Sequence, residues 1–399
     1  MKILLVNPFD KIPGEQFRDQ RYTVLYNKLR VNHQVLWISS DYHHWTHTVR
    51  KTENIPYNDK PNLILIPVIK YKRNIGITRL LSHLMFSLRA IGKLKEIGFK
   101  PDLIICVAPV EAMYLFTSYA RKRSVRIVLD VLDLWPDLFI KPFPYLTKWL
   151  GRILFGPYFW MSQRAFRYAD HITSVSQSYT KWAMRRGGRN DDENSSFYYL
   201  GGMSAGRQYN LAKSRERLTC LFAGQLGFNY DVATVIRASR ILRERNIDVE
   251  IVIAGDGYKR SSLVKEAEGL PSVRFTGWLE YDELMKLSID CHVGLNCYIG
   301  DATQSVPTKL FDYLSMGLLV VNSLEGETAE LLETTGTGLS YQSGDAEGLA
   351  KLLAGFSCQL DEVILKGRTS AELFDRHFRV DAIYNRMISE IIEKEHNGN

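Results

Sequence analysis

The stretch QSVPTKLFDYLSMG, residues 304–317, brings a proline, a lysine and an aspartate together between two short apolar runs. The runs at residues 291–297 and 318–321 are typical of buried strands, so the stretch between them is predicted to be the helix of a parallel βαβ unit. Ser305 would be its N-cap, and Pro307 would fit its first turn. The start of such a helix opens at the carboxyl edge of the sheet, where free N–H groups and the helix dipole favour an anion such as phosphate.

Three polar residues of this helix, Thr308, Lys309 and Asp312, are expected on the face opposite its apolar residues. Lys309 could add positive charge for a phosphate, and Asp312 could accept hydrogen bonds from sugar hydroxyls. The alternative is an ordinary capped helix with a Lys–Asp pair on its surface. These residues alone leave both interpretations open.

The two halves of the 399-residue chain differ in charge. Residues 1–200 hold 30 Lys and Arg against 16 Asp and Glu, a net of +14, whereas residues 201–399 hold 21 against 28, a net of −7. The first half is therefore expected to face something anionic. An anionic membrane surface fits better than nucleic acid, because the sequence has no basic helix with interleaved base-reading side chains and no RNA-binding aromatic signature.

Neither a targeting signal nor a metal site is expected from the sequence. MKILLVNPF is interpreted as a strand, since its apolar run is too short for a signal peptide and no cleavage site follows. The five cysteines form no metal or redox spacing, and no apolar stretch approaches the length of a membrane span. The histidine cluster HHWTH, residues 43–47, lacks an acidic partner and is interpreted as surface or loop. A cytoplasmic protein without a metal site is expected.

Apolar and amphipathic segments alternate along both halves, which predicts an α/β fold with two doubly wound domains. The chain is long enough for two such domains. In the first half, strands are expected at residues 3–7, 34–39, 63–68, 102–107, 126–131 and 171–175. Helices are expected there at 18–30, 78–97, 110–122, 145–168 and 177–186, with a loop at 188–196. In the second half, the strands are expected at 218–224, 249–257 and 273–279 besides the two runs named above. The helices are expected at 231–245, from 258, at 280–287, 346–356 and 381–395.

Four segments of the second half, in this order and spacing, resemble the C-terminal domain of family 4 glycosyltransferases with the GT-B fold: FAGQLG, IAGDGYKRSSL, VRFTGWLEYDEL and VPTKLFDYLSMGLLVV. PTKLFDY and VLDLWPD more narrowly resemble bacterial members that build capsular, O-antigen or exopolysaccharide repeat units. The resemblance is strong over residues 218–345 and looser in the first half. It implies two Rossmann-like domains facing across a cleft, a nucleotide-sugar donor as substrate with no cofactor, retention of anomeric configuration and no catalytic metal.

The resemblance also assigns roles to residues of the opening stretch. The family carries two acidic residues separated by seven others, and these positions match Gln304 and Asp312. Asp312 would hold the ribose hydroxyls, Gln304 would contact the donor sugar, and the amides of Thr308 and Lys309 would meet the diphosphate.

Two further segments match donor-site positions of the family. The loop PFDKIPGEQFR resembles the glycine loop of the first domain, so Gly14 would approach the donor phosphate and Glu15 the sugar. Trp278 and Leu279, in GWL, match the stretch beside the nucleobase. Trp278 could instead be simple core packing.

The sequence departs from the family at positions that usually grip the diphosphate. Many relatives carry an arginine after the glycine that matches Gly224, and a lysine a few residues on, where this chain has Gln225 and Tyr230. A histidine near the end of an N-domain strand is replaced by Leu132, next to Asp133. Asp133 would orient the acceptor or the donor sugar, or else cap the following turn.

Positive charge could come from Lys309, or from Arg18 or Arg21 behind the first glycine loop. The sequence thus predicts a metal-independent retaining glycosyltransferase that acts on a saccharide acceptor, lipid-linked, in cell-surface polysaccharide synthesis. The alternative is a donor-dead GT-B subunit that partners another glycosyltransferase. A nucleotide-sugar 2-epimerase would need a different acid–base set, and a periplasmic binding protein would need a signal peptide.

Domain boundaries follow from the same segments. Residues 1–200 would form an N-terminal, acceptor-side Rossmann-like domain, and residues 218–375 a C-terminal, nucleotide-sugar-binding one. Residues 201–217 would link them. A C-terminal helix within residues 376–399 could pack on the N-terminal domain.

A basic aromatic stretch, KWLGRILFGPYFWMSQRAFR at residues 148–167, suggests peripheral contact with the inner face of the cell membrane. Gly156-Pro157 is expected to divide it into two short helices. The alternative is a buried crossover helix whose aromatic residues pack on the sheet.

Overall fold

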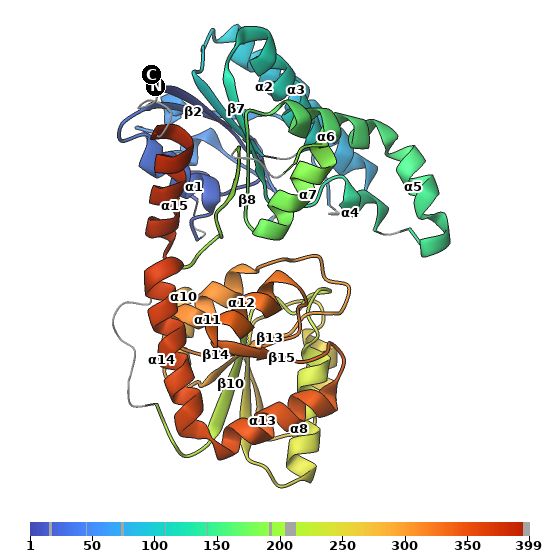
Figure 1. The fold of residues 1–399 in the computed structure, drawn as a ribbon, viewed down its shortest axis with the longest axis vertical. Coiled ribbons are helices and arrows are strands. Elements are labelled where there is room, and N and C mark those ends of the chain that lie inside the picture. Colours follow the sequence, from blue (N-terminus) through green and yellow to red (C-terminus); the bar gives the residue numbers. More distant parts are fainter. Residues whose placement is uncertain are drawn as a thin grey trace. The chain divides into compact units, whose positions relative to one another are not determined.

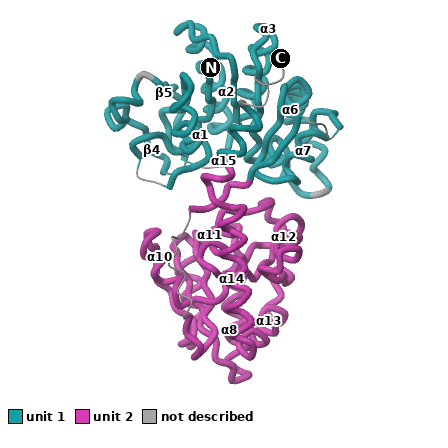
Figure 2. The backbone as a smooth tube through the Cα atoms, turned by 60° about the vertical axis from the view of Figure 1, so that its left-hand side comes forward, with its two compact units in different colours: residues 1–198, 384–399 teal, residues 199–383 magenta. Residues whose placement is uncertain are grey.

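The computed structural model describes residues 1–15, 18–44, 46–72, 76–107, 109–141, 143–190, 194–203 and 213–393. The chain divides into two compact units, which Figure 2 colours separately: unit 1 comprises residues 1–198 with 384–399, and unit 2 comprises residues 199–383. Each unit contains its own parallel sheet (Figure 1). Parts of five segments interpreted from the sequence lie outside the described residues, namely residues 16–17, 45, 191–193, 204–212 and 394–399.

The sheet of unit 1 has seven parallel strands in the order β5-β2-β1-β6-β7-β8-β9. The strands are β1 Lys2–Val6, β2 Gln34–Ser40, β5 Leu63–Ile66, β6 Leu103–Val107, β7 Arg126–Val131, β8 His171–Ser174 and β9 Ser195–Phe197. Those predicted from apolar runs are confirmed. The expected loop at residues 188–196 is wrong at its end, because β9 pairs with β8 as an edge strand despite its polar sequence.

Helices and a hairpin complete unit 1. The helices are α1 Arg21–Leu29, α2 Ile77–Glu96, α3 Val110–Arg123, α4 Asp137–Ile140, α5 Lys148–Leu154, α6 Gly156–Tyr168 and α7 Gln177–Gly187. Helix α15, Val380–Ile388, crosses the boundary between the units, and unit 1 contains its residues from 384 onwards and the π-helical turn Ser389–Glu393. The predicted break at Gly156-Pro157 is confirmed, since α5 ends at Leu154 and α6 begins at Gly156.

The histidine cluster was expected to be surface or loop, and this is wrong for its first residue, His43. It forms an antiparallel hairpin of β3, Tyr42–His43, and β4, Thr48–Val49. His43 is buried, and its ring nitrogen Nδ1 accepts a hydrogen bond from the backbone N–H of Thr46.

A buried ion pair connects helix and sheet inside unit 1. Arg21 of α1 donates from Nε to Asp130 of β7 over 2.7 Å and from a terminal nitrogen to the other carboxylate oxygen over 3.0 Å. The same guanidinium donates to the carbonyl of Tyr198 and lies 5.4 Å from the ring centre of Tyr384. Both charged side chains are buried. Arg21 is therefore committed to the core, and the prediction that it could supply charge to a donor is wrong.

The sheet of unit 2 has six parallel strands in the order β12-β11-β10-β13-β14-β15. The strands are β10 Leu218–Ala223, β11 Val249–Ala254, β12 Val273–Gly277, β13 Val293–Asn296, β14 Leu319–Asn322 and β15 Gly338–Ser340. The helices are α8 Val232–Glu244, α9 Arg260–Glu266, α10 Tyr281–Ser288, α11 Thr308–Ser315, α12 Glu327–Thr335, α13 Ala346–Cys358 and α14 Leu360–His377. Side chains alternate along β10, so that Cys220 and Phe222 join one apolar cluster and Leu221 joins another on the opposite face.

Two helices of unit 2 have no counterpart in the sequence interpretation, α12 and α14. The buried face of α14 includes small residues, among them Gly367, where a Cβ atom would lie only 2.3 Å from the carbonyl oxygen of Gly317. A face of small residues weakens the apolar periodicity by which helices are recognised. No helix in the described part of the chain is long and apolar enough to cross a membrane.

Candidate functional site

The helix predicted from the opening stretch is present as α11, but it begins later than expected. Pro307, not Ser305, occupies the N-cap position, and no side chain caps the first turn. Ser305 instead donates from its hydroxyl to Glu327 of α12 over 2.9 Å. Since α11 follows β13 at the carboxyl edge of the sheet, its first N–H groups, including those of Thr308 and Lys309, remain uncapped by any side chain there.

Thr308, Lys309 and Asp312 are all half-buried on α11, but the side chain of Lys309 turns inward, so the alternative of a Lys–Asp pair on the surface is wrong. The nitrogen Nζ of Lys309 is buried and has no hydrogen-bond partner among the described residues. It lies 3.7 Å from the ring centre of Tyr230, 4.3 Å from that of Phe222 and 5.5 Å from that of Tyr298. These distances fall within the range of cation–π attraction, which explains why the side chain turns inward.

Burial strongly perturbs this amine. Desolvation lowers the pKa of Lys309 to about 7, against the smaller upward influences of Cys297 and Asp312. Near neutral pH the group is therefore poised between amine and ammonium. An anion placed beside it would favour the ammonium form.

Glycines bring backbone close to this amine. Gly224 follows β10 with φ +146°, and a Cβ atom there would lie 2.9 Å from Nζ of Lys309. A Cβ atom at Gly255, after β11, would lie 1.8 Å from the carbonyl oxygen of Gly224. The loops after β10 and β11 are thus packed backbone to backbone, which only glycine permits. The structure therefore brings the predicted residues Gly224 and Lys309 into contact.

The other residues of unit 2 that were predicted for the donor site differ in their exposure to solvent. Gln225 is exposed, and Asp312 is half-buried in the first turns of α11. The amide oxygen Oε1 of Gln304 is buried and accepts no hydrogen bond from the residues that the structure describes. Such a buried orphan acceptor is uncommon and requires an explanation, such as a ligand that donates to it.

Trp278 is 66% exposed, so the core-packing alternative is wrong for it. Its indole N–H donates to Glu280 over 3.3 Å. Leu279 is half-buried and packs against an apolar cluster of the sheet. Phe228 and Tyr258 are also exposed aromatic residues on the loops after β10 and β11. The carboxyl edge of β10, β11 and β12 therefore carries three exposed rings, two of which the sequence interpretation did not single out.

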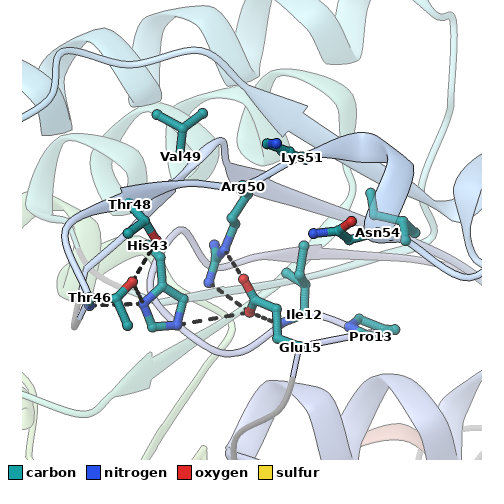
Figure 3. A pocket seen from close by; sticks show the side chains of 11 residues that line it. Ile12, Pro13, Glu15, His43, Thr46, Thr48, Val49, Arg50, Lys51 and Asn54 are labelled. Carbon is teal, nitrogen blue, oxygen red and sulfur yellow. Dashed lines mark hydrogen bonds and ion pairs between the residues drawn. The ribbon is translucent and has the colours of Figure 1, made fainter.

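In unit 1, the predicted glycine loop is held by a neighbouring turn. Gly14 has φ +93°, and a Cβ atom there would lie 2.3 Å from the carbonyl oxygen of Asn54. Glu15 does not present an unpaired carboxylate, because its Oε1 accepts from Arg50 over 2.9 Å and its Oε2 accepts from the backbone of Ile12 over 2.9 Å. Glu15 lines a hollow shown in Figure 3.

Asp133 follows β7 at the carboxyl edge of the sheet of unit 1. The residue is solvent-exposed, yet protein crowds its carboxylate and raises the pKa of Asp133 to about 6, with Arg79 and Trp135 acting in the opposite direction. The guanidinium of Arg79, on α2, lies 4.8 Å from the ring centre of Trp135. Its Nε donates to Nε2 of His83, one turn further along the helix, over 3.4 Å.

Sequence reasoning missed Arg79 and His83, and nothing in their spacing singles them out. His83 is buried, and its Nδ1 has no hydrogen-bond partner among the described residues. Burial lowers the pKa of His83 well below its usual value, so the ring is neutral. Arg79, Trp135 and the neutral His83 therefore form an aromatic and cationic surface beside Asp133. In the described part of the chain, no group of three or more His, Cys, Asp or Glu residues is placed to hold a metal ion.

Comparison with known proteins gives both a family match and a fold. Residues 217–356 match the family model described as "Glycosyl transferases group 1". A curated relative, "Amylovoran biosynthesis glycosyltransferase AmsK" from Erwinia amylovora, is 26% identical over 190 residues, which cover 45% of this chain and 45% of the relative. The matched region thus spans less than half of that relative's length.

Solved structures match over nearly the whole chain. Alr3699/HepE from Anabaena, in complex with UDP-glucose, has a TM-score of 0.62 at 17% identity, over 98% of this chain and 99% of that one. The lipopolysaccharide outer core galactosyltransferase WaaB, in its apo form, has a TM-score of 0.64 at 15% identity, over 99% and 100% of the two chains. At these identities the likeness shows a common fold.

Replacing Lys309 with methionine is expected to stabilise the folded protein by about 1–3 kcal/mol, because an unsatisfied buried donor is removed while the volume is kept. The folded-state pKa of about 7 lies below the ordinary lysine value, so the unfolded chain binds more protons above pH 7. Wild-type stability therefore rises with pH from about 7 towards 10, and the advantage of Lys309→Met shrinks over that window. Urea unfolding at several pH values measures both effects.

The matched control is Lys351→Met, which removes an exposed lysine of α13. It is expected to change stability by less than about 0.5 kcal/mol at every pH. A loss of stability in Lys309→Met would show that the buried amine is not an unsatisfied group.

Proposed function

Because this chain belongs to the group 1 glycosyltransferases and has their GT-B fold, we propose that it transfers a sugar from a nucleotide-sugar donor to a saccharide acceptor, with retention of the donor's anomeric configuration. The observation that carries the proposal is the poised amine of Lys309 beside Gly224, at the uncapped start of α11. Amine and amides together suit a diphosphate. The relative AmsK supports a role in polysaccharide synthesis, as its name assigns it to amylovoran biosynthesis.

The donor is proposed to be a nucleoside diphosphate sugar held by unit 2. The Anabaena structure, which contains UDP-glucose, supports a uridine nucleotide as the first choice. Asp312 would hold the ribose hydroxyls, Gln304 would donate from its amide to the sugar or accept from it, and Trp278 with Leu279 would flank the base. The orphan oxygen of Gln304 supports its part in this assignment.

Chemistry at this site needs a stabilised leaving diphosphate and an acceptor hydroxyl that loses its proton. Preorganised amides of Thr308 and Lys309, together with the Lys309 ammonium, would stabilise the developing charge. Front-face attack lets the departing phosphate take the acceptor proton, so no protein base is required. In unit 1, Gly14 and Glu15 would approach the donor, and Asp133, beside Arg79, would orient a sugar.

A second function, a donor-dead GT-B subunit that partners another transferase, is favoured by one specific observation. The positions where many relatives carry the phosphate-gripping arginine and lysine hold the exposed Gln225 and the ring of Tyr230. The two hypotheses differ in nucleotide binding. A dead subunit would not bind a nucleoside diphosphate with an affinity that depends on Lys309.

UDP affinity is expected to fall as pH rises above about 7, by up to tenfold per unit, because binding then requires Lys309 to take up a proton. Below that pH the group is already an ammonium, and the dependence levels off. Isothermal titration calorimetry in buffers of different ionisation enthalpy measures both the affinity and the proton uptake.

Two variants separate the contributions to UDP binding. Lys309→Met is expected to bind weakly with no proton uptake, and Asp312→Ala to lose about ten- to hundredfold affinity while keeping the uptake, since ribose contacts to a charged acceptor are removed. Unchanged affinity in both variants would refute the site, and absent binding of every nucleoside diphosphate by the wild type would favour the donor-dead subunit.

Product formed from an α-linked donor sugar is expected to keep the α configuration, and activity is expected to survive a chelator. Both expectations follow from the resemblance to retaining, metal-independent enzymes. Proton NMR of the product, with and without excess EDTA, measures them together. An inverted anomeric centre, or restoration of lost activity by a divalent ion, would contradict the proposal.

The acceptor is proposed to be lipid-linked, with unit 1 resting on an anionic membrane surface. Exposed apolar side chains gather on α5 and beside it, with Leu146 83%, Ile153 69%, Leu154 65% and Trp149 59% exposed. The alternative of a helix buried on the sheet is therefore wrong for α5, which lies at the margin of unit 1 (Figure 1). Residues 138–169 contain five basic and no acidic side chains, so charge and apolar surface both suit a headgroup interface.

Wild-type protein is expected to float with anionic vesicles at low salt and to release as salt rises. Leu154→Ser on α5 is expected to weaken flotation severalfold, whereas Leu365→Ser on α14 of unit 2 removes a similarly exposed leucine and is expected to have no effect; the two are 65% and 60% exposed. Folded wild-type protein that stays with the soluble fraction at low salt would disprove membrane contact and leave sugar transfer untouched.

A further inference from the structure

The hollow lined by Glu15 belongs entirely to unit 1 and has a volume of about 230 Å³. It lies between the glycine loop and the β3–β4 hairpin, as Figure 3 shows. The volume lies below the range typical of sites for drug-sized ligands, so the hollow suits a single small ring.

One wall of the hollow is a rigid acceptor of hydrogen bonds. Arg50 is buried, and its guanidinium donates to Glu15, to Ser39 Oγ over 3.0 Å and to the carbonyl of Asp10 over 2.6 Å. The backbone N–H of Ile12 also donates to Glu15. The carboxylate is thus fixed in place and its charge is matched by Arg50, while its remaining lone pairs can accept from a ligand.

A donor faces this carboxylate. Because Nδ1 of His43 accepts from the backbone N–H of Thr46 over 3.1 Å, the ring proton belongs on Nε2. Nε2 lies 3.9 Å from Oε2 of Glu15, too far for a direct hydrogen bond. A hydroxyl group placed between them could accept from Nε2–H and donate to Oε2. Burial and Arg50 lower the pKa of His43, so the ring is neutral and keeps this arrangement near neutral pH.

The remaining walls combine short polar groups with an apolar floor. Thr48 and Asn54 line the rim, where a hydroxyl and a side-chain amide can each donate and accept. Ile12 and Ile55 lie beneath and are buried. Alternating donors and acceptors over an apolar floor match the hydroxyls and C–H face of a sugar ring.

We propose that this hollow binds one neutral monosaccharide unit of the acceptor, with Glu15 and His43 sharing one of its hydroxyls. The identification of the ligand as an acceptor sugar rests on the proposed sugar transfer. It assigns Glu15 to the acceptor and not to the donor sugar. It needs no contribution from unit 2.

Saturation-transfer NMR of the full-length protein tests the proposal with methyl glycosides of glucose, galactose, mannose, N-acetylglucosamine and glucuronic acid as probes. At least one neutral glycoside is expected to receive saturation. Thr48→Trp, which fills the rim, is expected to weaken that response at least tenfold. Thr52→Trp places the same side chain on the neighbouring 3-10 turn, Thr52–Asn54, outside the lining, and is expected to leave the response unchanged.

A UDP titration on the same samples separates this proposal from the proposed function. Thr48→Trp is expected to bind UDP as the wild type does, because UDP is assigned to unit 2. Glycoside binding without UDP binding would uphold the hollow and overturn the donor site. No response from any neutral probe, a response from the glucuronide alone, or an equal response in Thr48→Trp would each overturn the hollow as a neutral sugar site.

Discussion

The amine of Lys309, buried among three aromatic rings without a hydrogen-bond partner in the described chain, is the constraint that organises the carboxyl edge of unit 2. An unpaired buried amine opposes folding, so the surrounding residues must hold it there. Gly224 and Gly255 allow the loops to close over it, since side chains at either position would collide with Nζ or with backbone. Stability is thus given up at a place where the negative charge of the proposed donor diphosphate would restore it.

Sequence patterns predicted the elements of this edge but not the direction of its key side chain. The prediction of a helix between two apolar runs is confirmed by α11, because periodicity and strand composition are local properties of the sequence. Helical spacing placed Lys309 beside Thr308 and Asp312, and the structure turns it towards Tyr230 instead. The attraction comes from rings on β10, on the loop after it and on the loop after β13, and helical spacing carries no information about them. The N-cap is Pro307 and not the predicted Ser305 for a similar reason. Ser305 donates to Glu327 of α12, a helix that was not predicted from the sequence.

In unit 1, the fold was more predictable than the site. The predicted strands follow continuous apolar runs, as expected for a parallel sheet covered on both faces. Arg79, Trp135 and Asp133 come together from a helix and from a loop more than 50 residues away in the sequence, and no motif joins them. The β3–β4 hairpin beside the hollow of Figure 3 was also missed, because its strands are two residues each and the histidines suggested a loop. Short polar elements depend on tertiary contacts that composition does not encode.

Unit 1 consists of two separate chain segments, and this discontinuity has a consequence for its synthesis on the ribosome. The boundary falls within α15, and the later segment contributes the buried Tyr384, Met387 and Ile391. Arg126 of β7 donates to the carbonyl of Ile391 over 2.6 Å. All of unit 2 is translated before this segment, so unit 2 has its full complement of residues while unit 1 still exposes the apolar surface that α15 covers. The usual order, in which the N-terminal domain of a nascent chain is completed first, is therefore reversed.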